Sequence, residues 1–294
     1  MTTPLVFDRP LVRRRLVRAL EQGYADFLLV RAVEDLEERL STVLRSFALA
    51  LDVGTPTPVA ADALRRSGHV ETVIRLSPVP EPGSVVGDEE RLPFSGERFD
   101  LAVSLLALHG VNDLPGSLIQ IRRALRADGL FIGALLGGST LTELRQSLTQ
   151  AEAEIEGGVS PRVAPFADLR DIGGLLQRAG FALPVTDTDV VRVRYANAFS
   201  LMRDLRRMGL TNALLDRRKT PLRRATLMRA AEIYAERFGD ADGRIPATFE
   251  IIWLSGWTPH GSQQKPLRPG SAKTRLADAL GVKEGAPKSE SDET

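Results

Sequence analysis

Apolar runs alternate with helix-forming runs along residues 47–156, and this alternation constrains the fold more than any other feature of the sequence. The apolar runs at 47–53, 99–108 and 129–138 are continuous. A strand that is apolar on both sides is typical of the centre of a parallel sheet, because both faces of such a sheet are covered. The pattern therefore predicts an α/β fold, with helices on both faces of a mostly parallel sheet.

The same pattern predicts where the individual elements lie. Apolar spacings of three and four mark helices, and Gly or Pro marks their ends. We expect strands near 47–53, 69–76, 84–86, 99–108, 129–138, 186–195 and 244–259, and helices near 9–20, 27–38, 59–68, 113–129, 139–158, 168–180, 197–208 and 220–238.

Three parts of the chain are expected from composition and pattern. Residues 1–46 form an N-terminal helical segment, and residues 47–259 form the α/β domain. From residue 260 onward, Gly, Pro, Ser, Lys and Glu dominate, which predicts a flexible tail over 260–294.

Composition excludes several classes of function. The formal net charge is +1, so no global field favours nucleic acid. The chain has no cysteine, which excludes disulfides, thiolate metal sites and a cysteine nucleophile. Its three histidines are scattered, and we expect no metal site. No apolar run is long enough to span a membrane, and the N-terminus lacks the apolar core of a secretory signal. These features predict a cytoplasmic location.

Ligands of open α/β sheets bind beyond the carboxyl ends of the strands. The first loop at this edge follows Asp52 and contains Gly54, a residue that lets a backbone approach a ligand closely. Prolines at 56 and 58 then replace further glycines, and they have no N–H to donate. Pro58 also suits the first turn of a helix. As a cofactor signature, this turn alone is weak.

The next three loops carry the other candidate residues. Leu76 stands where nucleotide-binding folds commonly place a ribose-binding acid, and losing that acid costs about 1.5–3 kcal/mol. Asp88 and Glu89 are acceptors for an exocyclic amine, or else belong to a solvated acidic turn. His109, at the end of the most apolar strand, either faces the cleft or has a structural role.

An arginine cluster marks the first helix. It comprises Arg9, Arg13, Arg14, Arg15 and Arg18. The cluster is either a solvated helix face or a surface for an acidic partner or an anionic lipid membrane.

Several motifs resemble a known family. They include the sequences GDEERLPF, HGVNDLP, GGSTLTELR, SLMRDLRRMGLTNAL and ATFEIIWLSGW, and the resemblance extends over nearly the whole chain. The chain resembles class I S-adenosylmethionine-dependent methyltransferases. More narrowly, it resembles the mitochondrial complex I assembly factor that acts as an arginine hydroxylase, and its alphaproteobacterial homologues.

This resemblance implies a Rossmann-like sheet of seven strands with the last one antiparallel, and a helical cap inserted at about 196–245. It also implies S-adenosylmethionine as cofactor, and Asp52, Gly54 and Asp88 match the family's binding residues. Glu89 and His109, named above from their loops, complete the set of candidate cofactor-binding residues. The sequence departs from the family at Thr55–Pro58, at Leu76, and at Gly110, where an aromatic residue is usual.

Two functions from different classes follow. The first is a methyltransferase-like assembly or partner-binding factor with a degenerate S-adenosylmethionine site, whose partner is a protein such as a respiratory complex subunit. The Arg-rich first helix and the cap would provide the contact surface, and the first helix would also provide any peripheral contact with a membrane. The alternative is an active S-adenosylmethionine-dependent methyltransferase or an arginine-hydroxylase-type protein-modifying enzyme. A pocket adapted to another small molecule is a third option.

Overall fold

A computed structural model describes residues 5–263 of the chain. The chain divides into two units, 1–259 and 260–294. The tail predicted at 260–294 lies almost entirely outside the described residues. Within the part of the chain that is described, no helix combines the length and the apolar character needed to cross a membrane.

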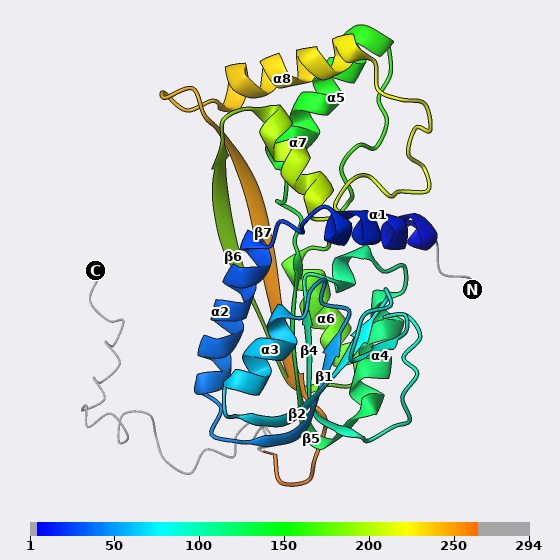
Figure 1. Cartoon of the computed structure of the whole chain (residues 1–294), viewed down its shortest axis with the longest axis vertical. Helices are drawn as coiled ribbons and strands as arrows, with labels where there is room; N and C mark the ends of the chain where they lie inside the picture. The colour runs from blue at the N-terminus through cyan, green and yellow to red at the C-terminus, as the bar shows by residue number, and fades with distance from the viewer. Residues whose placement is uncertain (1–4, 264–294) are drawn as a thin grey trace, which may run out of the picture. The chain divides into compact units, whose positions relative to one another are not determined.

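Seven strands form one sheet in the order β3-β2-β1-β4-β5-β7-β6 (Figure 1). The fold class and the number of strands agree with the expectation from the sequence. Only β7 runs antiparallel to its neighbours. The strands are β1 (Phe47–Val53), β2 (Val70–Ser77), β3 (Ser84–Val86), β4 (Phe99–Leu105), β5 (Leu125–Leu136), β6 (Ala182–Tyr195) and β7 (Ile245–Trp257).

Helices cover both faces of the sheet, which explains why its central strands are continuously apolar. One apolar core includes residues of α2, α3, α7 and α8, and a second includes residues of α4 and α6. The helices are α1 (Arg9–Glu21), α2 (Phe27–Ser41), α3 (Val59–Arg66), α4 (Leu114–Ala124), α5 (Thr142–Glu156), α6 (Leu169–Ala179), α7 (Ala198–Arg207) and α8 (Arg224–Phe238), with a short 3-10 turn η1 (Leu108–Gly110).

The helix predicted at 113–129 is shorter than expected. It ends at Ala124, and β5 begins at Leu125. Leu125 pairs with Phe99 of β4, and the amide of Arg98 donates to the carbonyl of Ala124 at 2.8 Å. Gly129 predicts a helix end after residue 128, but pairing with the neighbouring strand outweighs this local signal.

The cap and the first helix lie near the candidate site. Helices α7 and α8 are inserted between β6 and β7, and α8 packs along α5. In Figure 1, α1 (dark blue) crosses between this helical cap and the end of the sheet. Asp8 caps the N-terminus of α1, and its side chain accepts from the amide of Leu11 at 3.1 Å. This placement brings Arg9 and Arg13 of α1 to the acidic loop that follows β3.

Candidate functional site

Arg75 of β2 forms a buried ion pair with Asp52 of β1. Its Nη1 lies 2.9 Å from Asp52 Oδ2, and the two side chains are 4% and 0% exposed. The two residues are paired in the strand register, so their side chains leave the sheet on the same face. Burial raises the pKa of Asp52 to about 6, while Arg75 and the hydroxyl of Thr55 oppose this rise. Asp52 is therefore ionised at pH 7 and is neutralised by a side chain of the same protein.

The proline-containing turn after β1 is organised around the guanidinium of Arg75. Nη1 donates to the carbonyl of Thr57 at 2.6 Å, and Nη2 donates to the carbonyl of Thr55 at 2.8 Å. Nε donates to the carboxylate of Glu81. Because both prolines of this turn lack an N–H, the turn presents carbonyl oxygens, which suit a cation. The space beside Asp52 is thus filled by an internal cation.

Gly54 has the positive φ, +71°, that glycine adopts without strain. A Cβ at this position would lie only 2.6 Å from Oε1 of Glu89. Its N–H donates to the carbonyl of Leu76 at 2.9 Å. The glycine is therefore required for the close approach of Glu89, and its amide is already used within the protein.

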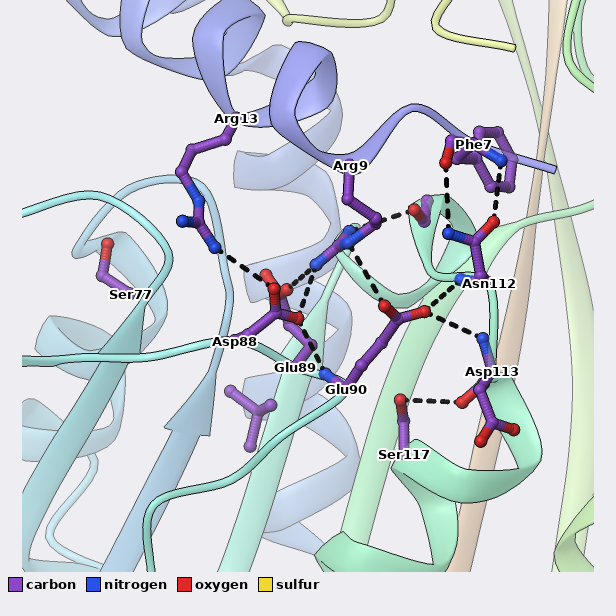
Figure 2. Close-up of polar contacts among 12 residues, drawn as sticks. Phe7, Arg9, Arg13, Ser77, Asp88, Glu89, Glu90, Asn112, Asp113 and Ser117 are labelled. Atoms are coloured by element: carbon purple, nitrogen blue, oxygen red, sulfur yellow. Dashed lines mark hydrogen bonds and ion pairs between the residues drawn. The ribbon is translucent and has the colours of Figure 1, made fainter. Parts of the chain in front are cut away.

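The acidic loop after β3 is neutralised by α1, as Figure 2 shows. Nη2 of Arg9 lies 2.9 Å from Asp88 Oδ1 and also contacts the carboxylate of Glu89. Arg13 Nη2 lies 3.2 Å from Asp88 Oδ2. Burial opposes ionisation of Asp88, but the amide of Glu90 and the charge of Arg9 hold the pKa of Asp88 below its usual value. Both carboxylate oxygens of Asp88 are thus occupied by arginine.

Polar contacts also hold the chain that leads into α1 (Figure 2). Asn112 Oδ1 accepts from the amides of Val6 at 2.8 Å and Phe7 at 2.7 Å, and its Nδ2 donates to the carbonyl of Phe7 at 3.1 Å. Glu90 accepts from the amides of Asn112 and Asp113. These contacts fix the start of α1 over the carboxyl ends of the strands.

A cavity of about 70 Å³ remains under α1. Small-molecule sites usually enclose about 300–1,000 Å³, several times this volume. Gly54, Glu89 and His109 line the cavity together with Arg9 and residues of α1 and the cap, whereas Asp52 and Asp88 do not. The structure therefore brings together three of the five residues that the sequence singled out.

His109 lies in η1 with its ring against Phe166, at a centroid distance of 5.9 Å. Its Nδ1 is buried and has no hydrogen-bond partner among the described residues. Burial lowers the pKa of His109 to about 4. The imidazole is therefore neutral at pH 7.

An NMR titration should show that His109 remains neutral down to a pH near 4. Burial penalises the cation in the folded state, whereas the unfolded chain binds the proton near pH 6.5. The resulting contribution to stability is complete above pH 6.5 and is lost as the pH falls toward 4. His109→Gln identifies the resonance by its disappearance. A midpoint near 6.5 in the folded protein would show that the ring is solvated.

Two arginines that matter here were not singled out from the sequence. From the sequence, position 76 is where an acid that binds ribose is expected, and Leu76 stands there instead. In the structure, the Leu76 side chain belongs to the apolar core, and the Arg75 side chain points toward Asp52. Strand alternation could have revealed this, because neighbouring residues of a strand point to opposite faces. Arg9 was treated as one member of a uniform cluster, and only the docking of α1 distinguishes it.

A larger hollow lies elsewhere in the described part of the molecule. It has a volume of about 670 Å³ and is lined by Phe94, Arg123 and Leu125, among others. Leu125 begins β5, so this hollow lies at the amino ends of the parallel strands, opposite the edge where such folds bind ligands. Within residues 5–263, no three His, Cys, Asp or Glu side chains are grouped so as to hold a metal ion.

The strand order, the single antiparallel strand and the loops at the carboxyl edge define a class I methyltransferase fold. A methyltransferase domain family matches residues 51–133. The fold is also that of the BH2331 protein of Bacillus halodurans, a candidate methyltransferase, with a TM-score of 0.52 at 16% identity over 77% of this chain and 98% of that one.

Two curated relatives narrow the assignment. The mitochondrial arginine-hydroxylase NDUFAF5 of Danio rerio is 42% identical over 93% of this chain and 89% of the relative. The malonyl-[acyl-carrier protein] O-methyltransferase of Xylella fastidiosa is 32% identical over 86% of this chain and 89% of the relative. The chain belongs to the family of methyltransferase-fold proteins that includes arginine-hydroxylase NDUFAF5.

The comparison corrects the location expected from the sequence. The NDUFAF5 relatives are named as mitochondrial proteins, so the prediction of a cytoplasmic location is wrong on this finding. That prediction was based on the lack of a signal or membrane segment, and such a lack does not distinguish one aqueous compartment from another.

Proposed function

We propose that this chain is an assembly or partner-binding factor of the respiratory complex I type, in which the protein's own arginines close the S-adenosylmethionine site of the methyltransferase fold. The observation that carries the proposal is the buried pair of Arg75 and Asp52. It places a cation at the first turn, beside the position where the family binds its cofactor.

The residues present do not fit S-adenosylmethionine. The cofactor carries a sulfonium and an ammonium group, and Arg75 would repel both at short range. Ribose hydroxyls need an acceptor, but Leu76 is apolar and the oxygens of Asp52 are bound to Arg75 and Thr55. The amine of adenine needs an acceptor as well, and both oxygens of Asp88 are bound to arginines. The cavity of about 70 Å³ is also too small.

Retention of the fold without its cofactor has a physical basis in these contacts. Buried carboxylates are unfavourable unless a cation or hydrogen-bond donors neutralise them. Arg75 neutralises Asp52, and Arg9 neutralises Glu89. The loops at the carboxyl edge of the sheet can therefore fold without a ligand. The outer surface of the molecule remains available for binding a partner.

Calorimetric titration should detect no saturable binding of S-adenosylmethionine or S-adenosylhomocysteine to the purified protein. We expect a Kd weaker than about 1 mM, because several cofactor contacts are missing and each contributes on the order of 1–3 kcal/mol. Neither ligand should raise Tm, since a ligand that does not bind cannot stabilise the folded state.

The Xylella fastidiosa relative, titrated under the same conditions, is the positive control. Low-micromolar binding to the present chain would overturn the closed-site proposal. The same experiment with Arg9→Met and with Arg75→Met asks whether either arginine alone blocks the site. A saturable signal that appears only in a variant would support closure by that arginine.

A protein-modifying enzyme is the second candidate, favoured by the name of the relatives at 42% identity, arginine-hydroxylase. It predicts that a partner subunit gains a hydroxylated arginine only when this chain is present. Mass spectrometry of that subunit from cells with and without the chain distinguishes the two candidates. An unmodified subunit in both samples, with normal assembly only in the first, supports the assembly role.

A further inference from the structure

The arginines of α1 fall into two sets with different surroundings. Arg9 and Arg13 bind the acidic loop that follows β3. The side chains of Arg14 and Arg18 are exposed and make no hydrogen bond or ion pair within the described residues. Arg15 is half-buried and donates to the carbonyl of Thr211 rather than to a carboxylate. One side of the helix is thus neutralised internally, and the other is not.

The second set is extended by Arg217, from the loop between α7 and α8. Figure 1 shows this loop (yellow-green) passing next to α1 (dark blue). Arg217 Nη2 lies 3.1 Å from Asp8 Oδ2. Burial lowers the pKa of Arg15, and repulsion from Arg217, Arg18 and Arg14 lowers it further. The positive charges of Arg14, Arg15, Arg18 and Arg217 therefore lie close to one another, and Asp8 offsets only part of them.

Exposed aliphatic side chains adjoin these arginines. The segment before α1 and the loop after α7 form a bridge, in which the amide of Leu215 donates to the carbonyl of Val6 at 2.9 Å. Leu5, Val6 and Leu215 are 68%, 37% and 40% exposed. The bridge leads directly into Asp8 and Arg217. We call the combined region the α1 docking surface; it comprises Leu5, Val6, Arg14, Arg15, Arg18, Leu215 and Arg217.

We propose that the α1 docking surface binds an acidic protein segment that carries aliphatic side chains. This inference rests on the proposed assembly role and adds the chemistry of its partner. Carboxylates would relieve the repulsion among the arginines, and aliphatic groups would cover Leu5 and Leu215. A protein segment is favoured over a lipid surface because the apolar side of α1 is already used. Val12 and Leu16 line the internal cavity and Ala19 is buried, so α1 has no free apolar face to insert.

Charge reversal at the two contact-free arginines tests the proposal. The variant is Arg14→Glu with Arg18→Glu, and the probe is a short fluorescein-labelled peptide of Glu and Leu, followed by fluorescence anisotropy. We expect the wild-type chain to bind this peptide in a salt-dependent manner, and the variant to bind at least about tenfold more weakly. A peptide of Lys and Leu should not bind.

Arg66→Glu with Arg178→Glu is the matched control. Both residues are exposed at the ends of α3 and α6, and neither side chain makes a hydrogen bond or ion pair within the described residues. The control changes net charge by the same amount and should bind within about twofold of wild type. An equal loss in both variants would show that only net charge matters, and would overturn the proposal. Failure of the wild-type chain to bind the acidic peptide would also overturn the proposal.

Vesicles of phosphatidylcholine and phosphatidylserine provide the third arm. Binding to vesicles that depends on Arg14 and Arg18, without binding to the acidic peptide, would identify the surface as membrane-facing and overturn the proposal. The cofactor titration is independent of these measurements. If the chain binds both the cofactor and the acidic peptide tightly, only the closed-site proposal is overturned. If it binds neither, only the docking-surface proposal is overturned.

A photo-crosslinking amino acid at position 14, compared with one at position 66, extends the test to the cell. Position 14 should crosslink to protein, and the crosslinked peptides should be acidic. Basic peptides at position 14, or lipid, would overturn the proposal.

Discussion

Replacement of Arg75 by methionine should lower the free energy of unfolding by about 3–5 kcal/mol at pH 7, because it leaves the carboxylate of Asp52 buried without a cation. Asp52 is 0% exposed and cannot turn to water. For a domain of this size, the loss corresponds to a fall in Tm of roughly 10 °C. Urea unfolding followed by circular dichroism measures it.

The loss should shrink at pH 5. Without Arg75, the pKa of Asp52 rises above its value of about 6, so the carboxyl group is protonated at pH 5 and the cost of a buried charge disappears. The double variant Asp52→Asn with Arg75→Met should likewise be more stable than Arg75→Met alone, because no charge is left unpaired.

Arg65→Met is the matched control for Arg75→Met. Arg65 lies 2.8 Å from Asp62, but the two side chains are 45% and 50% exposed, so its loss should cost less than about 1 kcal/mol. If Arg75→Met were as stable as this control at pH 7, the Arg75–Asp52 pair could not be what replaces a ligand at this edge of the sheet. Should Arg75→Met fail to fold, the double variant still tests the same charge argument.

Loss of Arg9 should free α1 from the loop that follows β3. Arg9→Met removes the cation shared by Asp88, Glu89 and Glu90. Glu89 is only 5% exposed, and burial already raises its pKa. We expect a loss of about 1.5–3 kcal/mol at pH 7. Amide hydrogen exchange of residues 9–21 should become faster, because local opening of α1 becomes easier.

Arg14→Met, in the same helix, is the control for Arg9→Met. Arg14 makes no contact with the acidic loop, so its replacement should leave both stability and exchange of α1 nearly unchanged. Equal exchange rates in the two variants would show that Arg9 does not hold the helix in place. In that case, the contacts of Arg9 could not explain why the cavity under α1 is small.

The two ion pairs have one physical feature in common. In each, a carboxylate at the carboxyl edge of the sheet is bound by an arginine of the same chain, Arg75 for Asp52 and Arg9 for Glu89. An internal cation of this kind is held at effectively high concentration, and a ligand must displace it before it can bind. On the proposed function, a ligand competes with these arginines for the acidic residues, so the number of acidic residues that remain does not decide whether the site is closed.

Secondary structure at the sheet could be predicted from the sequence because it depends on local pattern. The apolar run at 47–53 forms β1 within those bounds, and its burial follows from a position between two parallel neighbours. The end of α4 was predicted too late, because Leu125 pairs with β4 and that pairing is not local. A helix boundary next to a strand depends on tertiary contacts.

The candidate site was less predictable. Asp52 and Gly54 could be named from the first turn. On the second strand, however, the sequence drew attention to Leu76, whereas the side chain that lies beside Asp52 is that of Arg75. A shift of one residue along a strand exchanges the two faces of the sheet. The five arginines of the first helix looked equivalent in the sequence, since helical spacing does not tell which side a neighbour will cover.

The sequence by itself determined the class of fold, the order of its elements and the family, because hydrophobic periodicity and family motifs are properties of the local sequence. Only the tertiary structure decided that Arg75 and Arg9 occupy the edge where ligands bind, while the side chains of Arg14 and Arg18 have no partner within residues 5–263. Arg9 and Asp88 are 79 residues apart in the chain, and their contact exists only because α1 folds back over the sheet. Charge neutralisation acts through space, so no local pattern could have revealed it.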